Sequence, residues 1–170
     1  MIEINITKDL IENAQQRANT INFNRQELNK FGSEKDRTIF GYLGEEIVAK
    51  HLKIQNSIDD YEFDLSYKGY KLEIKTISCK FKPPSHFLCT VNSHNLNKIH
   101  KQKADFYVFT RILNDKSKGW ILGYIKCDDF FKKGSFVNKG SEVVKGVNFI
   151  KANATVLEIN KLHQFKPVYD

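Results

Sequence analysis

The chain has 170 residues, of which 41% are hydrophobic and 12% aromatic, which excludes a disordered polypeptide and is enough for one domain with a core. Lysine and arginine exceed aspartate and glutamate by 27 to 20, a balance compatible with a polyanionic partner. The sequence has no apolar run of membrane-spanning length, no secretory signal and no disulfide-like cysteine spacing, so we expect a cytoplasmic protein without a membrane partner.

We expect a single domain over residues 1–170, with residues 1–35 as a helical lead-in. Apolar residues recur at helical spacing between residues 7 and 30, before a Gly32-Ser33 break. The apolar positions are Leu10, Ile11, Ala14 and Ala18. A second helix is predicted from about Asp36 to Ile54, because Ser33 or Asp36 can cap it and a broad apolar stripe follows.

Two adjacent glutamates of this second helix differ in the direction they face. On a helical projection, Glu45 falls at the edge of the apolar stripe, whereas Glu46 falls among lysines on the solvent side. Glu45 is therefore the better site candidate. Gly41 and Gly44 precede it, and either close approach to a sheet or simple packing explains them equally well.

Residues 62–76, EFDLSYKGYKLEIKT, predict a β-hairpin, because apolar and polar residues alternate on both sides of Lys68-Gly69. A two-residue turn places Asp64 opposite Glu73 and brings Lys75 onto the same face. Two like charges directly opposite one another repel, so this pair needs an explanation. One explanation is a solvated face screened by lysines, and the other is a site for Mg²⁺ or Mn²⁺.

The remaining elements complete an α/β (α+β) fold with a central mixed sheet flanked by helices. A third strand, a short helix, two strands joined by a turn, another helix and a last strand are expected in that order. Their ranges are 86–91, 96–99, 104–113, 119–125, 128–133 and 155–159.

The arrangement of Asp64, eight residues, then Glu73-Ile74-Lys75 resembles the core of the PD-(D/E)xK nuclease superfamily. The segment GYLGEEIVAKHL, residues 41–52, is similar to the helix that often contributes a glutamate in junction-resolvase-like members. KPPSHFLCTVN, ADFYVFT and KGWILGYIKCDDFFKK are similar to phage-borne or mobile-element proteins of this type, which implies action in a bacterial host. The resemblance spans roughly residues 40–160, with Phe63 where the family name has proline.

The resemblance implies a restriction-endonuclease-like core and a Mg²⁺-dependent deoxyribonuclease, with Mn²⁺ as a substitute ion. Asp64, Glu73 and the backbone carbonyl of Ile74 would bind the metal, and Glu45 would contact it directly or through water. The ion would activate a water, and Lys75 would orient that water or stabilise the transition state. The expected reaction is phosphodiester hydrolysis in DNA by an endonuclease.

DNA, duplex or branched, is the expected partner, and a homodimer would fit the two strands of either substrate. Candidate phosphate contacts are Lys80, Lys82, Lys98, Lys101 and Lys103, although each has an inert, solvated role as an alternative. Two other functions stay open: a catalytically inactive nucleic-acid-binding module on the same fold, and an interaction protein that does not bind nucleic acid. Cys79, His86 and Cys89 are three potential zinc ligands without an obvious fourth.

Overall fold

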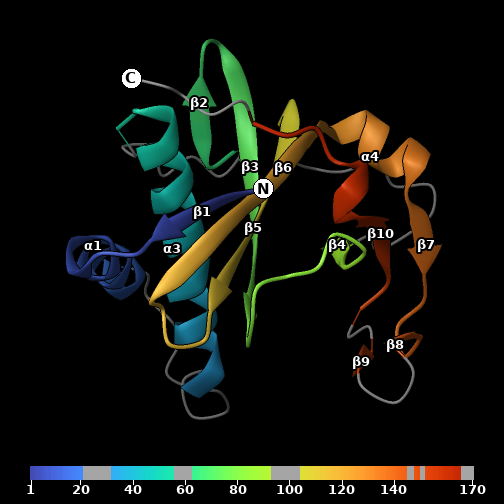
Figure 1. Cartoon of the computed structure of the whole chain (residues 1–170), viewed down its shortest axis with the longest axis horizontal. Coiled ribbons are helices and arrows are strands. Elements are labelled where there is room, and N and C mark those ends of the chain that lie inside the picture. Colours follow the sequence, from blue (N-terminus) through green and yellow to red (C-terminus); the bar gives the residue numbers. More distant parts are fainter. Residues whose placement is uncertain (21–31, 56–62, 93–103, 145–147, 150–151, 166–170) are drawn as a thin grey trace.

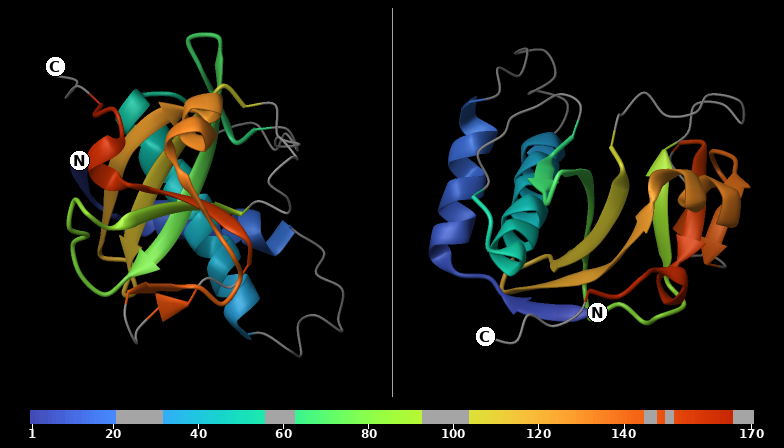
Figure 2. Two further views of the ribbon diagram at one scale, coloured as in Figure 1. Left: turned by 90° about the vertical axis from the view of Figure 1, so that its right-hand side faces the viewer. Right: turned by 90° about the horizontal axis from the view of Figure 1, so that it is seen from above.

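Two long helices, a five-stranded sheet and a smaller sheet form three successive layers (Figure 1, Figure 2). The computed structural model describes residues 1–20, 32–55, 63–92, 104–144, 148–149 and 152–165. The architecture is mixed α/β, as predicted. None of the described helices combines the length and the hydropathy needed to cross a membrane.

The helices and strands follow in chain order. They are β1 (Ile2–Asn5), α1 (Lys8–Thr20), α3 (Gly32–Leu52), β2 (Leu65–Tyr67), β3 (Tyr70–Cys79), β4 (Leu88–Asn92), β5 (Phe106–Leu113), β6 (Lys118–Lys126), α4 (Cys127–Lys133), β7 (Ser135–Val137), β8 (Glu142–Val144), β9 (Asn148–Phe149), β10 (Ala154–Glu158) and the 3₁₀ turn η1 (Ile159–Lys161).

The large sheet has the strand order β1-β6-β5-β3-β2. β3 and β5 are parallel, and the other pairs are antiparallel. β5 and β6 are the two strands that the sequence predicts over 104–113 and 119–125. β1 corrects the prediction that residues 1–35 are purely helical, because Ile2 and Ile4 alternate with polar residues and pair with β6.

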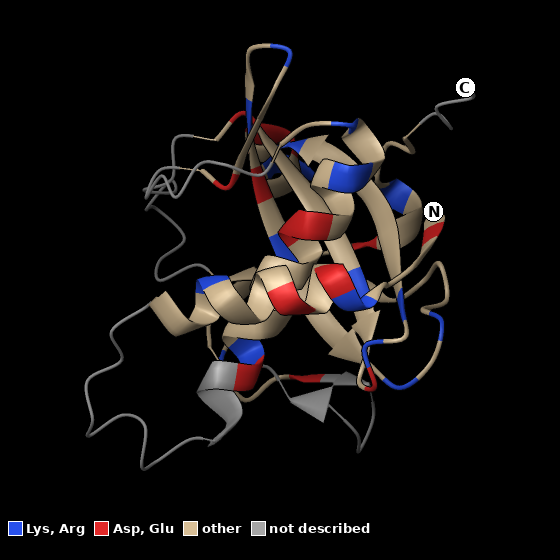
Figure 3. Ribbon diagram, turned by 90° about the vertical axis from the view of Figure 1, so that its left-hand side faces the viewer, with Lys and Arg blue, Asp and Glu red and all other residues tan. Residues whose placement is uncertain are grey.

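The helical layer covers one face of the large sheet. α3 buries Leu43, Ile47 and Val48 against that face, and each of these residues is 0% exposed. α1 lies outside α3 and buries Leu10, Ala14 and Ala18, which are three of the four residues the sequence places at helical spacing. On the side of the molecule viewed in Figure 3, acidic and basic residues are interspersed along these helices.

The other face of the large sheet is covered by the sheet β4-β10-β7 and by α4 (Figure 2). Phe130 of α4 is fully buried there with Tyr107 and Phe109 of β5. The third strand, predicted over 86–91, is β4, which pairs with β10 in the smaller sheet. The predicted short helix over 96–99 lies outside the described residues.

Candidate active site

The hairpin forms with the predicted register. Leu65 pairs with Leu72 and Tyr67 with Tyr70 across a two-residue turn. Lys68 and Gly69 have φ angles of 51° and 82°, and positive φ at both central positions is the requirement of a type I′ turn. Asp64 directly precedes β2 and lies just beyond the Leu65–Leu72 pair, close enough to Glu73 for the charge of Glu73 to act on it.

The carboxylate of Asp64, just before β2 begins, provides the hydrogen-bond acceptor for the next free backbone N–H of β3. Its Oδ2 accepts a hydrogen bond from the backbone N–H of Ile74 at 2.6 Å, and its own N–H donates to the carbonyl of Leu72 at 3.0 Å. In a longer hairpin, a backbone carbonyl of β2 would take the Ile74 N–H. The backbone of Ile74 thus faces the edge of β3 on which Asp64 lies. The predicted role of the Ile74 carbonyl as a metal ligand requires this orientation.

Glu73 and Lys75 face the second layer. Their partners on the parallel strand β5 are Tyr107 and Phe109, which belong to the core between the two sheets. Glu73 is only 5% exposed, and Lys75 Nζ lies 2.6 Å from Glu73 Oε1. The Lys75 ammonium also lies 5.9 Å from the centre of the Tyr107 ring. Glu73 therefore does not lie on a freely solvated face of the hairpin, because the second layer covers it.

The two opposing carboxylates are close enough to affect one another. Burial, and next the negative charge of Glu73, raise the pKa of Asp64 from 3.8 to about 6. The hydrogen bond from Ile74 and the positive charges of Lys75 and Arg17 act in the opposite direction. Burial also raises the pKa of Cys127 to about 12, with Glu73 as the next cause. Glu73 therefore lies close enough to influence both Asp64 and Cys127.

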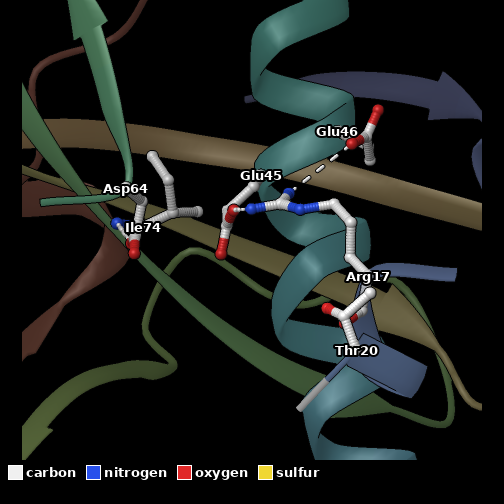
Figure 4. Close-up of polar contacts among 6 residues, drawn as sticks. All are labelled: Arg17, Thr20, Glu45, Glu46, Asp64 and Ile74. Atoms are coloured by element: carbon white, nitrogen blue, oxygen red, sulfur yellow. Dashed lines mark hydrogen bonds and ion pairs between the residues drawn. The ribbon is translucent and has the colours of Figure 1, made fainter. Parts of the chain in front are cut away.

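Glu45 is buried on α3, at 8% exposure, but it lies beside a cation from α1 (Figure 4). Arg17 Nη2 is 2.8 Å from Glu45 Oε2, and Arg17 Nη1 is 3.6 Å from Glu46 Oε1. The Glu46 side chain is only 12% exposed, so its predicted position on the solvent side is wrong. The physical reason is α1, which covers that flank of α3.

The donor chemistry of Asp64 and Glu73 fits a hard divalent cation. Mg²⁺ is commonly bound by one or two carboxylates together with water and substrate phosphate, and a cation would offset the repulsion that raises the Asp64 pKa. Over the described part of the chain, however, no three His, Cys, Asp or Glu side chains form a group able to hold a metal. Glu45 does not join Asp64 and Glu73 in such a group, and neither do the zinc candidates Cys79, His86 and Cys89 form one.

Two residues of this site were not found by sequence reasoning. Arg17 comes from α1, and Tyr107 comes from β5, where its ring is 0% exposed beside Lys75. No local pattern marks either residue, because each contact joins segments distant in the chain.

The raised pKa of Asp64 predicts that metal-free protein loses stability as pH rises. Its folded-state pKa, about 6, exceeds the ordinary 3.8, so the stabilising contribution is complete below 3.8 and is lost as pH rises through 6. Relative to Asp64→Asn, the unfolding free energy of the native protein should fall by roughly 2–3 kcal/mol between pH 4 and pH 7. Urea unfolding of both proteins with EDTA measures this; a difference that does not vary with pH contradicts it.

Comparisons with protein-family models, with curated proteins and with solved structures found no match. The function is therefore inferred from the residues and geometry of this site.

Proposed function

We propose that the protein is a Mg²⁺-dependent DNA endonuclease of the PD-(D/E)xK type. The observation that carries the proposal is the group formed by Asp64, Glu73 and Lys75. Burial and next the charge of Glu73 raise the pKa of Asp64, and Glu73 contacts the Lys75 ammonium at 2.6 Å. Lys75 is the ion-pair partner of Glu73, but the second carboxylate, Asp64, is still costly to the fold at neutral pH, because its pKa is raised to about 6. A role in stability alone therefore does not explain the pair.

Each residue of the group has a distinct part in this chemistry. The Ile74 N–H holds one oxygen of Asp64, which orients the carboxylate beside Glu73 so that both can bind one cation. A bound Mg²⁺ supplies Lewis acidity to the scissile phosphate and lowers the pKa of its water. Lys75 donates hydrogen bonds, so its ammonium can orient the attacking water or stabilise negative charge developing on the phosphate. Glu73 keeps that ammonium in position through the 2.6 Å contact.

Incubation of the purified full chain with supercoiled, linear, single-stranded and four-way-junction DNA tests the proposal. Mg²⁺ and Mn²⁺ should each support cleavage, and EDTA should abolish it. Nicking of supercoiled circles separates an endonuclease from an exonuclease, since a circle has no end. Cleavage that persists in EDTA would reject the mechanism.

A catalytically inactive nucleic-acid-binding module is the second candidate. The observation in its favour is the ion pair of Glu45 with Arg17, which leaves the helix glutamate outside the Asp64 and Glu73 group. Such a module would bind DNA with a strong salt dependence, would be indifferent to chelator and would cleave none of the substrates.

Lys80 and Lys82 are the described lysines that follow β3, and both are exposed. If they contact phosphates, Lys80→Ala and Lys82→Ala should each weaken DNA binding similarly for all sequences and lower the salt slope by about 1. Fluorescence anisotropy at several salt concentrations, with Asp64→Asn as the parent to prevent cleavage, measures both quantities. Lys139→Ala, also exposed, is the matched control. An unchanged salt slope would show that these lysines do not contact phosphates.

The predicted contacts of Lys98, Lys101 and Lys103 lie outside the described residues. The homodimer stays a prediction, and the mass of the protein in solution tests it.

A further inference from the structure

Arg17 is the internal counter-ion of the helix glutamate. Its guanidinium lies 2.8 Å from Glu45 and 3.6 Å from Glu46, and it stacks 4.1 Å from the centre of the Tyr42 ring. Figure 4 shows the guanidinium between the two glutamates, with Asp64 and Ile74 beyond Glu45 in this view. These contacts give Arg17 a defined orientation.

The backbone around Arg17 supports the same orientation. Arg17 lies in the last turn of α1, where a positive side chain complements the helix dipole. The hydroxyl of Thr20 donates to the Arg17 carbonyl at 2.7 Å, which satisfies a carbonyl of that turn. Ala14 and Ala18, the small residues on either side, are 0% exposed and bring α1 close to α3. The cation is thus built into the contact between the two helices.

The positive charge of Arg17 acts on two carboxylates. It pairs with Glu45 directly, and it also lowers the pKa of Asp64 from a distance, against the larger effects of burial and Glu73. A divalent cation bound at Asp64 and Glu73 would exert the same attraction on Glu45. Two cations near one buried carboxylate compete for it, and each weakens the binding of the other.

We propose that Arg17 takes the place of a metal ion at Glu45, so that Arg17 is a positioning residue that keeps Glu45 out of the metal's ligand set. This inference rests on the proposed function. The guanidinium and a divalent ion at Asp64 and Glu73 repel one another, so the Arg17–Glu45 pair and binding of the ion weaken each other by the same free energy.

The sign of the effect follows from charge. Removal of the guanidinium leaves Glu45 buried without its counter-ion, which lowers stability in the absence of metal. The same removal makes the site more negative and releases Glu45 as an additional ligand. Arg17→Met should therefore bind Mg²⁺ about tenfold more tightly than the native protein. It should also gain more in melting temperature from Mg²⁺ than the native protein does.

Calorimetric titration of the full chain with Mg²⁺, together with melting temperatures with and without Mg²⁺, tests the proposal. Arg17→Met should show both changes. Arg17→Met combined with Glu45→Gln, compared with Glu45→Gln alone, should show much smaller ones, because no carboxylate is then released. Arg17→Lys, which keeps the charge, should retain native affinity. Glu46→Gln is the matched control, because Glu46 contacts the same guanidinium at 3.6 Å.

Glu45→Gln in the native background keeps the proposal testable if Arg17→Met does not fold. A Glu45 held by Arg17 is not a ligand, so its replacement should change Mg²⁺ affinity less than about threefold, whereas loss of a true ligand costs tenfold or more. A larger loss would overturn the inference and leave the nuclease proposal intact. So would an Arg17→Met protein whose Mg²⁺ affinity equals the native one. Absence of Mg²⁺ binding in every variant would overturn both proposals.

Discussion

Asp64→Asn is expected to abolish DNA cleavage while leaving the fold at least as stable as the native one. The cleavage rate should fall by about a thousandfold or more, because the neutral amide is a poor ligand for Mg²⁺ and the charge that holds the ion beside the phosphate is lost. The amide oxygen can still accept the hydrogen bond from Ile74 that Asp64 accepts at 2.6 Å. At pH 7 and without metal, removal of a carboxylate whose pKa is raised to about 6 should increase the unfolding free energy.

Opposite changes in activity and stability distinguish this explanation from simple damage to the fold. A variant that loses activity through unfolding must lose stability as well. Initial rates on supercoiled DNA and urea unfolding in EDTA, measured on the same preparation, give the two quantities. Asp36→Asn, an exposed acid on α3, is the control for loss of one negative charge. Cleavage by Asp64→Asn at a tenth of the native rate or faster would contradict the assigned role.

The other two members of the group allow the same test of mechanism. Glu73→Gln and Lys75→Ala should each reduce the rate by about two to four orders of magnitude, since each removes a charge near the reacting phosphate. Lys75→Ala should leave Mg²⁺ affinity equal or higher, because it removes a competing positive charge 2.6 Å from Glu73. A Lys75→Ala enzyme with the native rate would assign this lysine to packing against Tyr107.

Gly44→Ala is expected to destabilise the protein by roughly 2–4 kcal/mol through overpacking between α3 and the sheet. A Cβ at this position would lie 1.9 Å from Thr76 Oγ1, 2.8 Å from Thr110 Oγ1 and 3.0 Å from Thr76 Cβ. Rotation of the Thr76 side chain cannot relieve the contact, because its Cβ is itself too close. The hydrogen bond between the two threonine hydroxyls, at 2.9 Å, would also be disturbed.

Gly41→Ala is the matched control on the same helix. A Cβ there meets no described atom within 4 Å, so the substitution should stabilise the helix by about 0.5–1 kcal/mol. Thermal and urea unfolding of the two variants should therefore shift in opposite directions. Adding Thr76→Ala to Gly44→Ala should recover part of the loss, as a double-mutant cycle would reveal. Equal stabilities for Gly41→Ala and Gly44→Ala would show that the helix can move away from the sheet at little cost.

The predicted elements that agree best with the structure are those whose formation depends on residues within a single segment. The hairpin depends on alternation and on a turn whose second residue, Gly69, accepts positive φ, and both lie within residues 62–76. α1 and α3 likewise follow from apolar spacing along single segments. β1 was missed because its four residues are too few for a clear period, and it forms only where β6 offers an edge.

The pairing partner of β4 could not be predicted for a related reason. Its sequence indicates an extended segment, but β10, more than sixty residues later in the chain, provides its partner. Gly41 and Gly44 also could not be distinguished from the sequence, because both lie on the same helix. Only the position of Thr76 shows that Gly44 is necessary and Gly41 replaceable.

The amino-acid sequence by itself determined the hairpin register and the candidate residues Asp64, Glu73 and Lys75 that it brings together, because hydrogen-bonding pattern and side-chain alternation within a hairpin are local properties. Only the tertiary structure decided that Glu73 is buried under a second layer and that Glu45 is neutralised by Arg17. Burial and ion pairing depend on which distant segments pack together, and those contacts set the energy of each charge.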